Sequence, residues 1–303
     1  MYSYDGLLKN LNEKNMTRST LADKLGVSSR TIAKISRGEK IAEHVIKRIA
    51  EYFECEPQEL YREVSDNPLL QMLRDEKSIG MTGGIYHELQ VRMTYNSNHI
   101  EGSKLSEAQT RMIYETYTVN VSGGIPVDDI LETVQHFRAI DYVIDAAEEP
   151  LTEDIIKELH RILKQNTKDS TLSWFAVGDY KKRANVVGGH ETTKPKDVPA
   201  RMKGLLSEYE SISNVNIEDI IRFHYDFESI HPFQDGNGRV GRLIALKECL
   251  RYRIVPFIIE DSKKNYYYRG LSQWNNEPGY LTDTCLDGQD MFRRLLRMFE
   301  IEE

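Results

Sequence analysis

The sequence has few cysteines and no long apolar run, and each absence excludes a class of protein. Its three cysteines (Cys55, Cys249 and Cys285) are odd in number and far apart. They therefore predict neither a disulfide framework nor a C-x-x-C metal site. No stretch of about 18 apolar residues is present, so no membrane-spanning helix is expected. The histidines show no H-E-x-x-H spacing, and the first residues lack a signal-peptide pattern. We expect a protein of the reducing cytoplasm without a zinc site.

Charge is distributed unevenly along a chain long enough for two or more domains. The net charge is −8, yet the segment from Lys14 to Arg48 contains nine basic residues and only three acidic ones. A basic segment in an otherwise acidic protein indicates a partner that binds at this segment, rather than general attraction of the whole protein to nucleic acid.

Residues 1–62 have the spacing of a small helical domain. Thr20 can cap a helix that contains Leu21 and Leu25, and Gly26 stands where a helix ends in a left-handed residue. Ser28 or Ser29 can then cap the next helix. This pattern resembles the helix-turn-helix of phage repressors.

The resemblance implies that the helix after the turn reads DNA. The residues expected to contact DNA are Ser28, Ser29, Arg30, Lys34 and Arg37. Such domains usually bind DNA as dimers, which makes a homodimer a further expectation. The alternative is a helical domain that serves only protein contact.

The remainder of the chain is predicted to be helical. A break at Ser65-Asp66-Asn67-Pro68, followed by Gly80, Gly83 and Gly84, indicates a linker over residues 63–82. Apolar residues recur with a helical period in several segments of 83–303. The expected class is all-α: a helical core with one small β-hairpin, preceded by the helix-turn-helix bundle.

The most informative segment is His-Pro-Phe-Gln-Asp-Gly-Asn-Gly-Arg-Val-Gly-Arg at residues 231–242, between two apolar helical segments. A Gly-rich turn that opens a helix presents backbone N–H groups and a positive dipole end, which suit phosphate. Arg239 and Arg242 can bind phosphate oxygens. Asp235 offers an oxygen ligand for Mg²⁺, and His231 can accept a proton near neutral pH. The combination predicts group transfer centred on a phosphate.

Every fixed position of this segment matches the signature of the Fic family, which the chain resembles. The resemblance implies transfer of AMP from Mg·ATP to a hydroxyl of a target protein or of the enzyme itself. It assigns the role of base to His231, of Mg²⁺ ligand to Asp235 and of loop anchor to Phe233. The residues assigned to the phosphates are Gly236, Asn237, Gly238, Arg239 and Arg242. The related Doc kinases carry an Asn-Lys variant, and Gly238-Arg239 departs from it.

Two further segments resemble parts of the same family. Ser97 and Glu101 match its inhibitory pattern, Ser/Thr-x-x-x-Glu-Gly/Asn, at the end of a predicted helix. Glu101 could form a bidentate ion pair with Arg242 and so restrain transfer. Asn185, Val186 and Val187, followed by Gly188-Gly189, are expected to form a hairpin flap that pairs with an extended target segment.

Three functions remain open from the sequence. The favoured one is a protein adenylyltransferase restrained by Glu101. The second is a DNA-binding transcriptional regulator whose Fic domain senses nucleotide or modifies only itself. The third keeps the loop but uses another nucleotide donor or removes AMP.

An aromatic cluster around Tyr266, Tyr267, Tyr268 and Trp274 forms either core or an adenine pocket.

Overall fold

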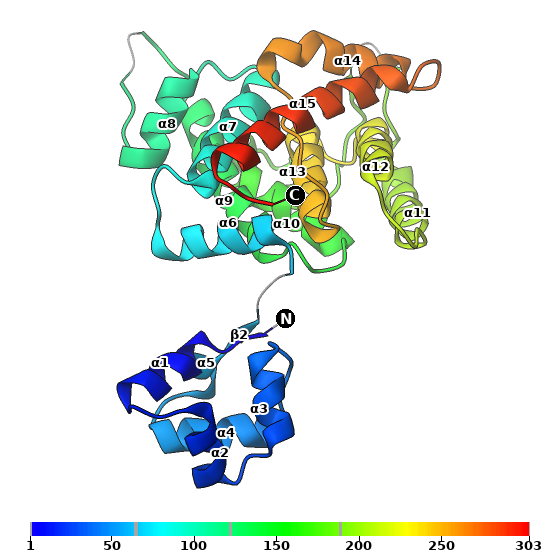
Figure 1. The fold of residues 1–303 in the computed structure, drawn as a ribbon. Helices are drawn as coiled ribbons and strands as arrows, with labels where there is room; N and C mark the ends of the chain where they lie inside the picture. The colour runs from blue at the N-terminus through cyan, green and yellow to red at the C-terminus, as the bar shows by residue number, and fades with distance from the viewer. Residues whose placement is uncertain (1, 64–65, 121–122, 188–189, 303) are drawn as a thin grey trace. The chain divides into compact units, whose positions relative to one another are not determined.

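The computed structural model describes residues 2–63, 66–120, 123–187 and 190–302. It divides into two compact units, Met1–Asn67 and Pro68–Glu303 (Figure 1). Helices make up most of both units, and the described strands form two short antiparallel pairs. The predicted all-α class with one hairpin in the larger unit is therefore confirmed. None of the described helices is long and apolar enough to cross a membrane.

In the described residues of the first unit, five helices form a bundle and two short strands pair with each other. Gly26 has φ 58° and ends the second helix, while the Ser28 hydroxyl accepts the Thr31 N–H at 3.2 Å and caps the third, as the sequence predicts. The second helix is capped by Thr17, whose hydroxyl accepts the Thr20 N–H at 3.1 Å, and not by Thr20 as expected. Buried apolar residues such as Leu7, Leu21 and Ile49 form the core of this unit. Its elements are β1 (Tyr2–Ser3), α1 (Asp5–Glu13), α2 (Arg18–Leu25), α3 (Ser29–Ser36), α4 (Glu43–Phe53), α5 (Pro57–Leu60) and β2 (Arg62–Glu63).

The second unit contains the remaining helices and one hairpin. The hairpin pairs Val186 with Glu191 and Val187 with His190. The elements are α6 (Pro68–Ile79), α7 (Ile85–Ile100), α8 (Glu107–Thr116), α9 (Val127–Asp145), α10 (Glu153–Lys164), β3 (Val186–Val187), β4 (His190–Glu191), α11 (Val198–Glu210), α12 (Ile217–Ile230), α13 (Asn237–Arg251), α14 (Lys264–Gln273) and α15 (Gly279–Met298), with 3₁₀ turns at Asp169–Thr171, Pro195–Asp197 and Asp261–Lys263.

The structure differs from the linker expected at residues 63–82. Residues Pro68–Ile79 form α6, which belongs to the second unit and contacts α7 and α9. Leu70 and Leu73 are fully buried in the core of that unit. Pro68 is the first residue of α6, where its missing N–H costs nothing, so this proline begins a helix of the second unit and not a linker.

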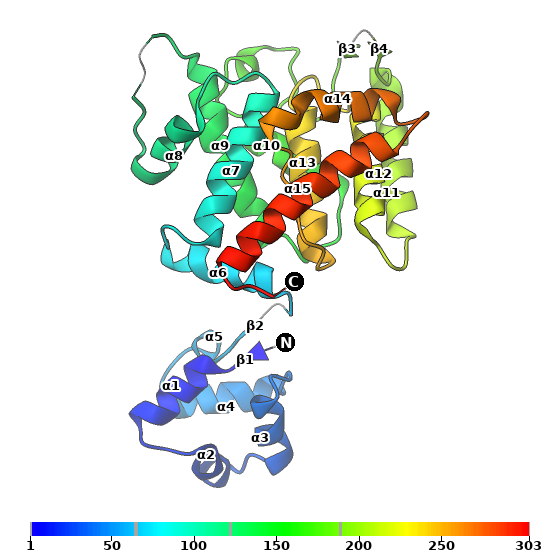
Figure 2. The same ribbon diagram turned by 45° about the horizontal axis from the view of Figure 1, so that its top comes forward.

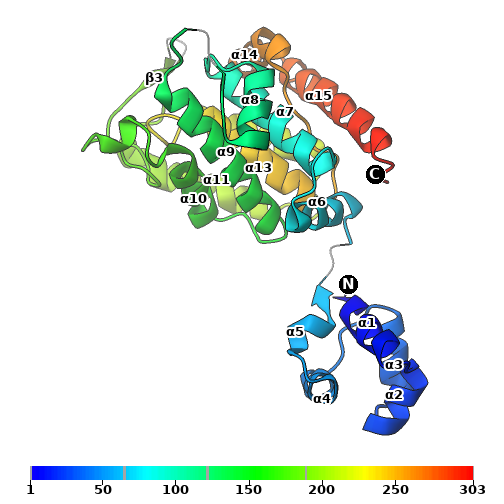
Figure 3. The same cartoon turned by 90° about the vertical axis from the view of Figure 1, so that its left-hand side faces the viewer.

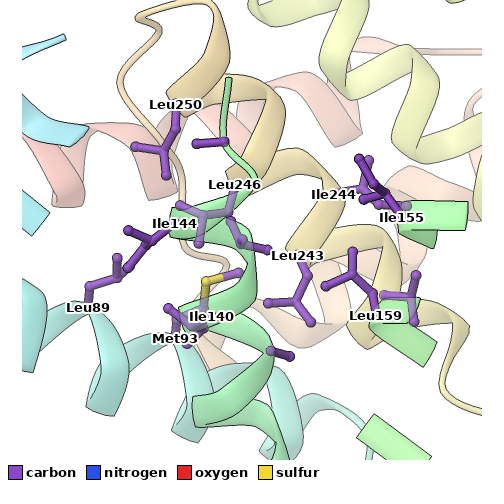
Figure 4. Close-up of a cluster of buried hydrophobic side chains, with 14 of the residues drawn as sticks. Leu89, Met93, Ile140, Ile144, Ile155, Leu159, Leu243, Ile244, Leu246 and Leu250 are labelled. Atoms are coloured by element: carbon purple, nitrogen blue, oxygen red, sulfur yellow. The ribbon is translucent and has the colours of Figure 1, made fainter. Parts of the chain in front are cut away.

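Helix α13 is the central element of the second unit. It packs against α7, α9, α10 and α12, and Figure 3 shows it behind α9. Figure 4 shows its Leu243, Ile244, Leu246 and Leu250 among apolar side chains of the neighbouring helices. Because α13 is buried on almost every face, its first turn is held rigidly by the helices around it.

Truncation of this core is expected to destabilise the second unit. Leu243→Ala should lower the free energy of unfolding by about 2–5 kcal/mol, because a fully buried side chain leaves a cavity. Both tryptophans, Trp174 and Trp274, belong to the second unit, so urea unfolding followed by tryptophan fluorescence isolates it. Val127→Ala, at a 70% exposed position, is the control and should change stability by less than about 0.5 kcal/mol. Equal losses in both variants would contradict the packing described.

Candidate active site

The loop between α12 and α13, residues 231–236, is held in one shape by its own backbone and by Asn237. His231 ends α12 at φ 52°, and its N–H donates to the Phe227 carbonyl at 3.0 Å. Gly236, at φ 81°, precedes α13. The Asn237 side chain accepts the Phe233 N–H at 2.8 Å and donates to the Phe233 carbonyl at 3.0 Å. The Asn237 side chain is therefore used to fix the loop. Of Asn237, only the backbone is then available to bind an anion.

Phe233 anchors the loop in the core. Its side chain is fully buried, and its ring stacks on His160 of α10 with the ring centroids 4.0 Å apart and the planes 5° from parallel. Tyr180 and Phe227 contact the same ring at centroid distances of 5.9 and 6.4 Å. A buried aromatic ring between these partners keeps the residues on either side of it, His231 and Asp235, from shifting.

His231 is placed to accept a proton. Burial and, to a lesser extent, the Lys181 ammonium lower the pKa of its imidazole to about 4, although a backbone hydrogen bond at Glu228 and the carboxylates of Asp235 and Glu101 oppose them. The ring is therefore neutral at pH 7 and has a free lone pair. Its backbone has a left-handed conformation, which is uncommon outside glycine but more frequent for asparagine, aspartate and histidine than for other residues, and it turns the chain sharply at the point where α12 ends.

Asp235 lies among cations. Its Oδ2 is 2.7 Å from Lys164 Nζ and 3.4 Å from Arg239 Nη2. Burial acts to raise the pKa of the Asp235 carboxyl, but Arg239 and Lys164 outweigh it and hold the pKa well below its usual range. About half of the Asp235 side chain is exposed. The carboxylate is thus ionised and open on one side.

Glu132 and Lys164 are site residues that the sequence reasoning missed. Glu132 of α9 contacts Arg239 Nη1 through Oε2 at 2.5 Å and Lys164 Nζ through Oε1 at 2.6 Å. Lys164 ends α10, is 3% exposed and also contacts Asp169 at 3.3 Å. Glu132 is a single acidic residue on an amphipathic helix, and no sequence pattern around it indicates that it contacts Arg239 and Lys164. Only packing of α9 and α10 against α13 brings these charges together.

Arg242 is held by the end of α7. Its Nη2 contacts Glu101 Oε1 at 2.7 Å and the Ser97 carbonyl at 2.9 Å, and its Nε donates to the Ser97 hydroxyl at 3.0 Å. The contact with Glu101 uses one oxygen rather than the expected bidentate geometry. The third nitrogen of Arg242, Nη1, donates to the Tyr267 hydroxyl at 3.4 Å, so the guanidinium contacts three residues.

The Glu101 carboxylate also lies against the first turn of α13. A Cβ built on Gly238 would stand 2.2 Å from Glu101 Oε1, so the carboxylate occupies the space that glycine leaves open. An anion at this position is favoured by the positive end of the α13 dipole. The site therefore already contains a protein carboxylate where the sequence predicts a phosphate-binding surface.

The predicted flap is the hairpin β3–β4, at the top of Figure 2. Val186 and Val187 are 63% and 47% exposed, so this short strand presents apolar side chains to solvent. Asn185 Nδ2 donates to the Phe233 and Gln234 carbonyls, each at 3.4 Å, which joins the flap to the loop. Gly188 and Gly189, the expected turn, lie outside the described residues.

The aromatic cluster divides into core and surface residues. Tyr267 is 1% exposed and its hydroxyl contacts His224 Nε2 at 2.8 Å, while Trp274 stacks on Tyr225. Tyr266 and Tyr268 are exposed, and the Tyr268 hydroxyl donates to the Ile100 carbonyl at 3.1 Å. Tyr267 therefore serves the core, whereas the exposed Tyr266 and Tyr268 are accessible to a ligand.

In the first unit, α3 has a basic face. Arg30, Lys34 and Arg37 follow one another by four and three residues, which places them on one side of the helix. Ile35, on the opposite side, is buried. Arg37 Nε contacts Glu39 at 2.6 Å, so part of its charge is already paired. Ser28 caps the helix, and Ser29 begins it.

Two family models match this chain. Residues 150–249 match the Fic/DOC family, and residues 7–60 match the helix-turn-helix family. Similar curated proteins include the protein adenylyltransferase Fic of Nematostella vectensis, 29% identical over 187 residues, and that of Drosophila willistoni, 32% identical over 188 residues. Each match covers 60% of this chain but only 42% and 36% of the relative.

Solved structures agree with the family assignment. A Fic domain containing signaling protein from Bacteroides thetaiotaomicron has a TM-score of 0.59 and 25% identity, with 76% of this chain and 94% of that chain covered. A Fic family protein from Desulfovibrio desulfuricans has a TM-score of 0.58 and 21% identity, which supports the fold alone, with 78% and 76% covered. The chain therefore contains a Fic/DOC-family domain, preceded by a helix-turn-helix domain.

Proposed function

We propose that this protein transfers AMP from Mg·ATP to a hydroxyl side chain of a target protein or of itself. The observation that carries the proposal is the neutral imidazole of His231 beside the glycine-rich start of α13, with Arg239 and Arg242 on the same helix. The names of the relatives in Nematostella vectensis and Drosophila willistoni, both protein adenylyltransferases, support it.

The proposed reaction is an in-line displacement at the α-phosphorus of ATP. The oxygen of the target hydroxyl forms a bond to the α-phosphorus, and the bond from that phosphorus to the oxygen bridging to the β-phosphate breaks. Pyrophosphate leaves with the electron pair, and the hydroxyl proton passes to the neutral ring of His231. The backbone of Gly236–Gly238 and the two arginines would stabilise the phosphate charge without forming a covalent intermediate.

Asp235 fits the role of Mg²⁺ ligand. It provides an ionised, half-exposed carboxylate. No cluster of three or more acidic, histidine or cysteine ligands is found in the described part of the chain. Mg²⁺ at nucleotide sites is commonly bound by one or two carboxylates together with substrate phosphates, so a single Asp is compatible with it. The ion would neutralise phosphate charge, while Lys164 and Arg239 orient the Asp235 carboxylate.

Glu101 is proposed to restrain this reaction. Its carboxylate forms an ion pair with Arg242 and fills the space over Gly238. Both residues are among those assigned to phosphate binding. A phosphate at Arg242 would have to displace this carboxylate, whose negative charge also repels it. Removal of Glu101 frees both positions at once.

Glu101→Gly is therefore expected to raise AMP transfer. A charged hydrogen bond of about 1.5–3 kcal/mol corresponds to a gain of roughly 10- to 100-fold. His231→Ala in that background should reduce transfer by about 10²- to 10⁴-fold, because the base is lost. The measurement uses ATP labelled at the α- or the γ-phosphate, with Mg²⁺, the full chain, and cell lysate as a source of acceptors.

Two variants serve as controls for the label experiment. Glu101→Gln keeps the side-chain size but removes the charge and should activate, whereas Glu107→Gly, a similar change at an exposed position of α8, should not. Label retained from the γ-phosphate would make the protein a kinase. Equal transfer by the wild type and Glu101→Gly would refute the restraint.

The pH dependence of transfer should reflect His231. Since its pKa is lowered to about 4, the base stays unprotonated through pH 6, and kcat/KM of Glu101→Gly should fall only as the pH approaches 4. Glu101 itself raises this pKa, so its removal moves the acid limb further down. A limb near pH 6.5 would contradict the assignment of a buried, neutral base.

Acid stability must be followed in the same experiment. Burial lowers the pKa of both His160 and His224 to about 3. Below pH 6.5 the unfolded chain therefore binds protons that the folded chain does not, and stability falls as the pH falls. Tryptophan fluorescence at each pH separates loss of folding from protonation of His231.

A second function, transcriptional regulation through DNA binding, is favoured by the basic face of α3. In this alternative the Fic domain senses nucleotide or modifies only itself. Binding of an operator that changes with ATP, without label transfer to other proteins, would support it.

The DNA-binding face can be tested with nonspecific duplex DNA at several salt concentrations. Arg30→Ala and Lys34→Ala should each weaken binding and lower the slope of log affinity against log salt by about one. Arg37→Ala should have less effect, because its guanidinium is already paired with Glu39. Lys9→Ala on α1 is the control. Unchanged affinity in all variants would favour a domain for protein contacts alone.

A further inference from the structure

We propose that Lys181 is a positioning residue that ties the flap to the catalytic loop, residues 231–236, and that its charge acts on His231. The electrostatic part of this inference rests on the proposed function, in which His231 is the base. Lys181 lies before the flap in sequence and is 2% exposed. No sequence motif marks it.

Lys181 holds both sides of the flap together. Its Nζ donates to Asn185 Oδ1 at 2.9 Å and to Thr192 Oγ1 at 2.6 Å, and these residues stand immediately before β3 and after β4. Thr192 Oγ1 also donates to the Asn185 carbonyl at 3.0 Å. The ammonium therefore closes the base of the hairpin.

The same residue is joined to the catalytic loop twice. Its backbone N–H donates to the carbonyl of Pro232 at 2.9 Å, next to His231. Its partner Asn185 donates to the Phe233 and Gln234 carbonyls. The flap, which would align a target, is thus hydrogen-bonded to the catalytic loop that contains the proposed base, and Lys181 contributes to both.

The charge of Lys181 is not neutralised by an ion pair among the described residues. Both acceptors of its ammonium are uncharged. In contrast, Lys157 contacts the carboxylates of Glu153 and Asp179, each at 2.9 Å. Burial lowers the pKa of Lys181 to about 8, so most of it is still charged at pH 7. A buried, unpaired ammonium acts strongly on its neighbours.

His231 faces charges of both signs. Lys181 disfavours the imidazolium, whereas the carboxylates of Asp235 and Glu101 and the backbone of Glu228 favour it. The Glu228 carboxyl has a pKa raised by burial to about 8, so it is largely neutral at pH 7. Lys181 is therefore the charge that opposes the two carboxylates, and it adds to the effect of burial in lowering the pKa of His231.

The test measures the His231 titration directly by NMR of the full chain with labelled histidine, and His231→Gln identifies the signal. Lys181→Met and Lys181→Gln should raise the pKa of His231 by about one unit, because a nearby cation is lost. Lys181→Arg keeps the charge and should leave it unchanged. Lys157→Met is the matched control and should also have no effect.

The set of variants separates the effect of the Lys181 charge from the effects of lost hydrogen bonds and of misfolding. Gln still donates to Asn185 and Thr192, so Lys181→Gln replaces the Met variant if that protein fails to fold. An unchanged His231 pKa in the neutral variants, or a pKa near 6.5 in the wild type, would overturn the proposal.

The kinetic readout uses a Glu101→Gly background. Loss of Lys181 should move the acid limb of kcat/KM upward by the same amount as the NMR titration and should raise KM for the target through the loosened flap. A rise in KM alone, without a shifted limb, would refute the electrostatic role. If Glu101→Gly transfers no label at all, the proposed function fails, while the NMR titration still decides the effect of Lys181 on His231.

Discussion

The burial of α13 is the constraint on which the second unit depends. A helix that is enclosed by α7, α9, α10 and α12 cannot shift without disturbing the packing of all four. Its first turn and the loop before it are therefore presented as a rigid surface, with Phe233 anchored on His160. A rigid N–H surface at a helix start binds an anion without the cost of ordering the backbone first.

Because α13 is buried, its charged side chains must be paired with groups of opposite charge. Arg239 and Arg242 are 3% and 5% exposed, and an unpaired buried guanidinium would be strongly destabilising. Glu132 and Asp235 pair the first, and Glu101 pairs the second. Of these carboxylates, Glu101 also fills the space over Gly238 that the proposed function gives to a phosphate. The stability of the protein without a nucleotide and the restraint proposed for Glu101 thus have one physical origin.

The two sides of the site differ in charge. Around Asp235, two cations hold a carboxylate ionised. Around His231, burial and the Lys181 ammonium lower the pKa of the imidazole. Groups only four residues apart in sequence therefore have pKa values shifted by different neighbours. This separation suits the proposed reaction, in which Asp235 stays charged as a Mg²⁺ ligand while His231 accepts a proton.

Much of the fold could be predicted because the signals were local. Gly26 and Ser28 mark a helix end and a helix start through their own conformational preferences, and apolar residues at helical spacing identify α9, α10 and α12. Pro68 shows the limit of such signals, since a proline can begin a helix as well as break one.

The sequence by itself determined the chemistry available at residues 231–242, because a base, a carboxylate, glycines and two arginines lie within one loop and the turns after it. Only the tertiary structure decided what surrounds them. Glu132, Lys164 and Lys181 reach the loop from separate segments, and Glu101 reaches Arg242 across 141 residues. Side chains so distant in sequence have no periodic or motif relationship. Their meeting depends on how the helices pack, and that packing sets which groups are charged, paired or free.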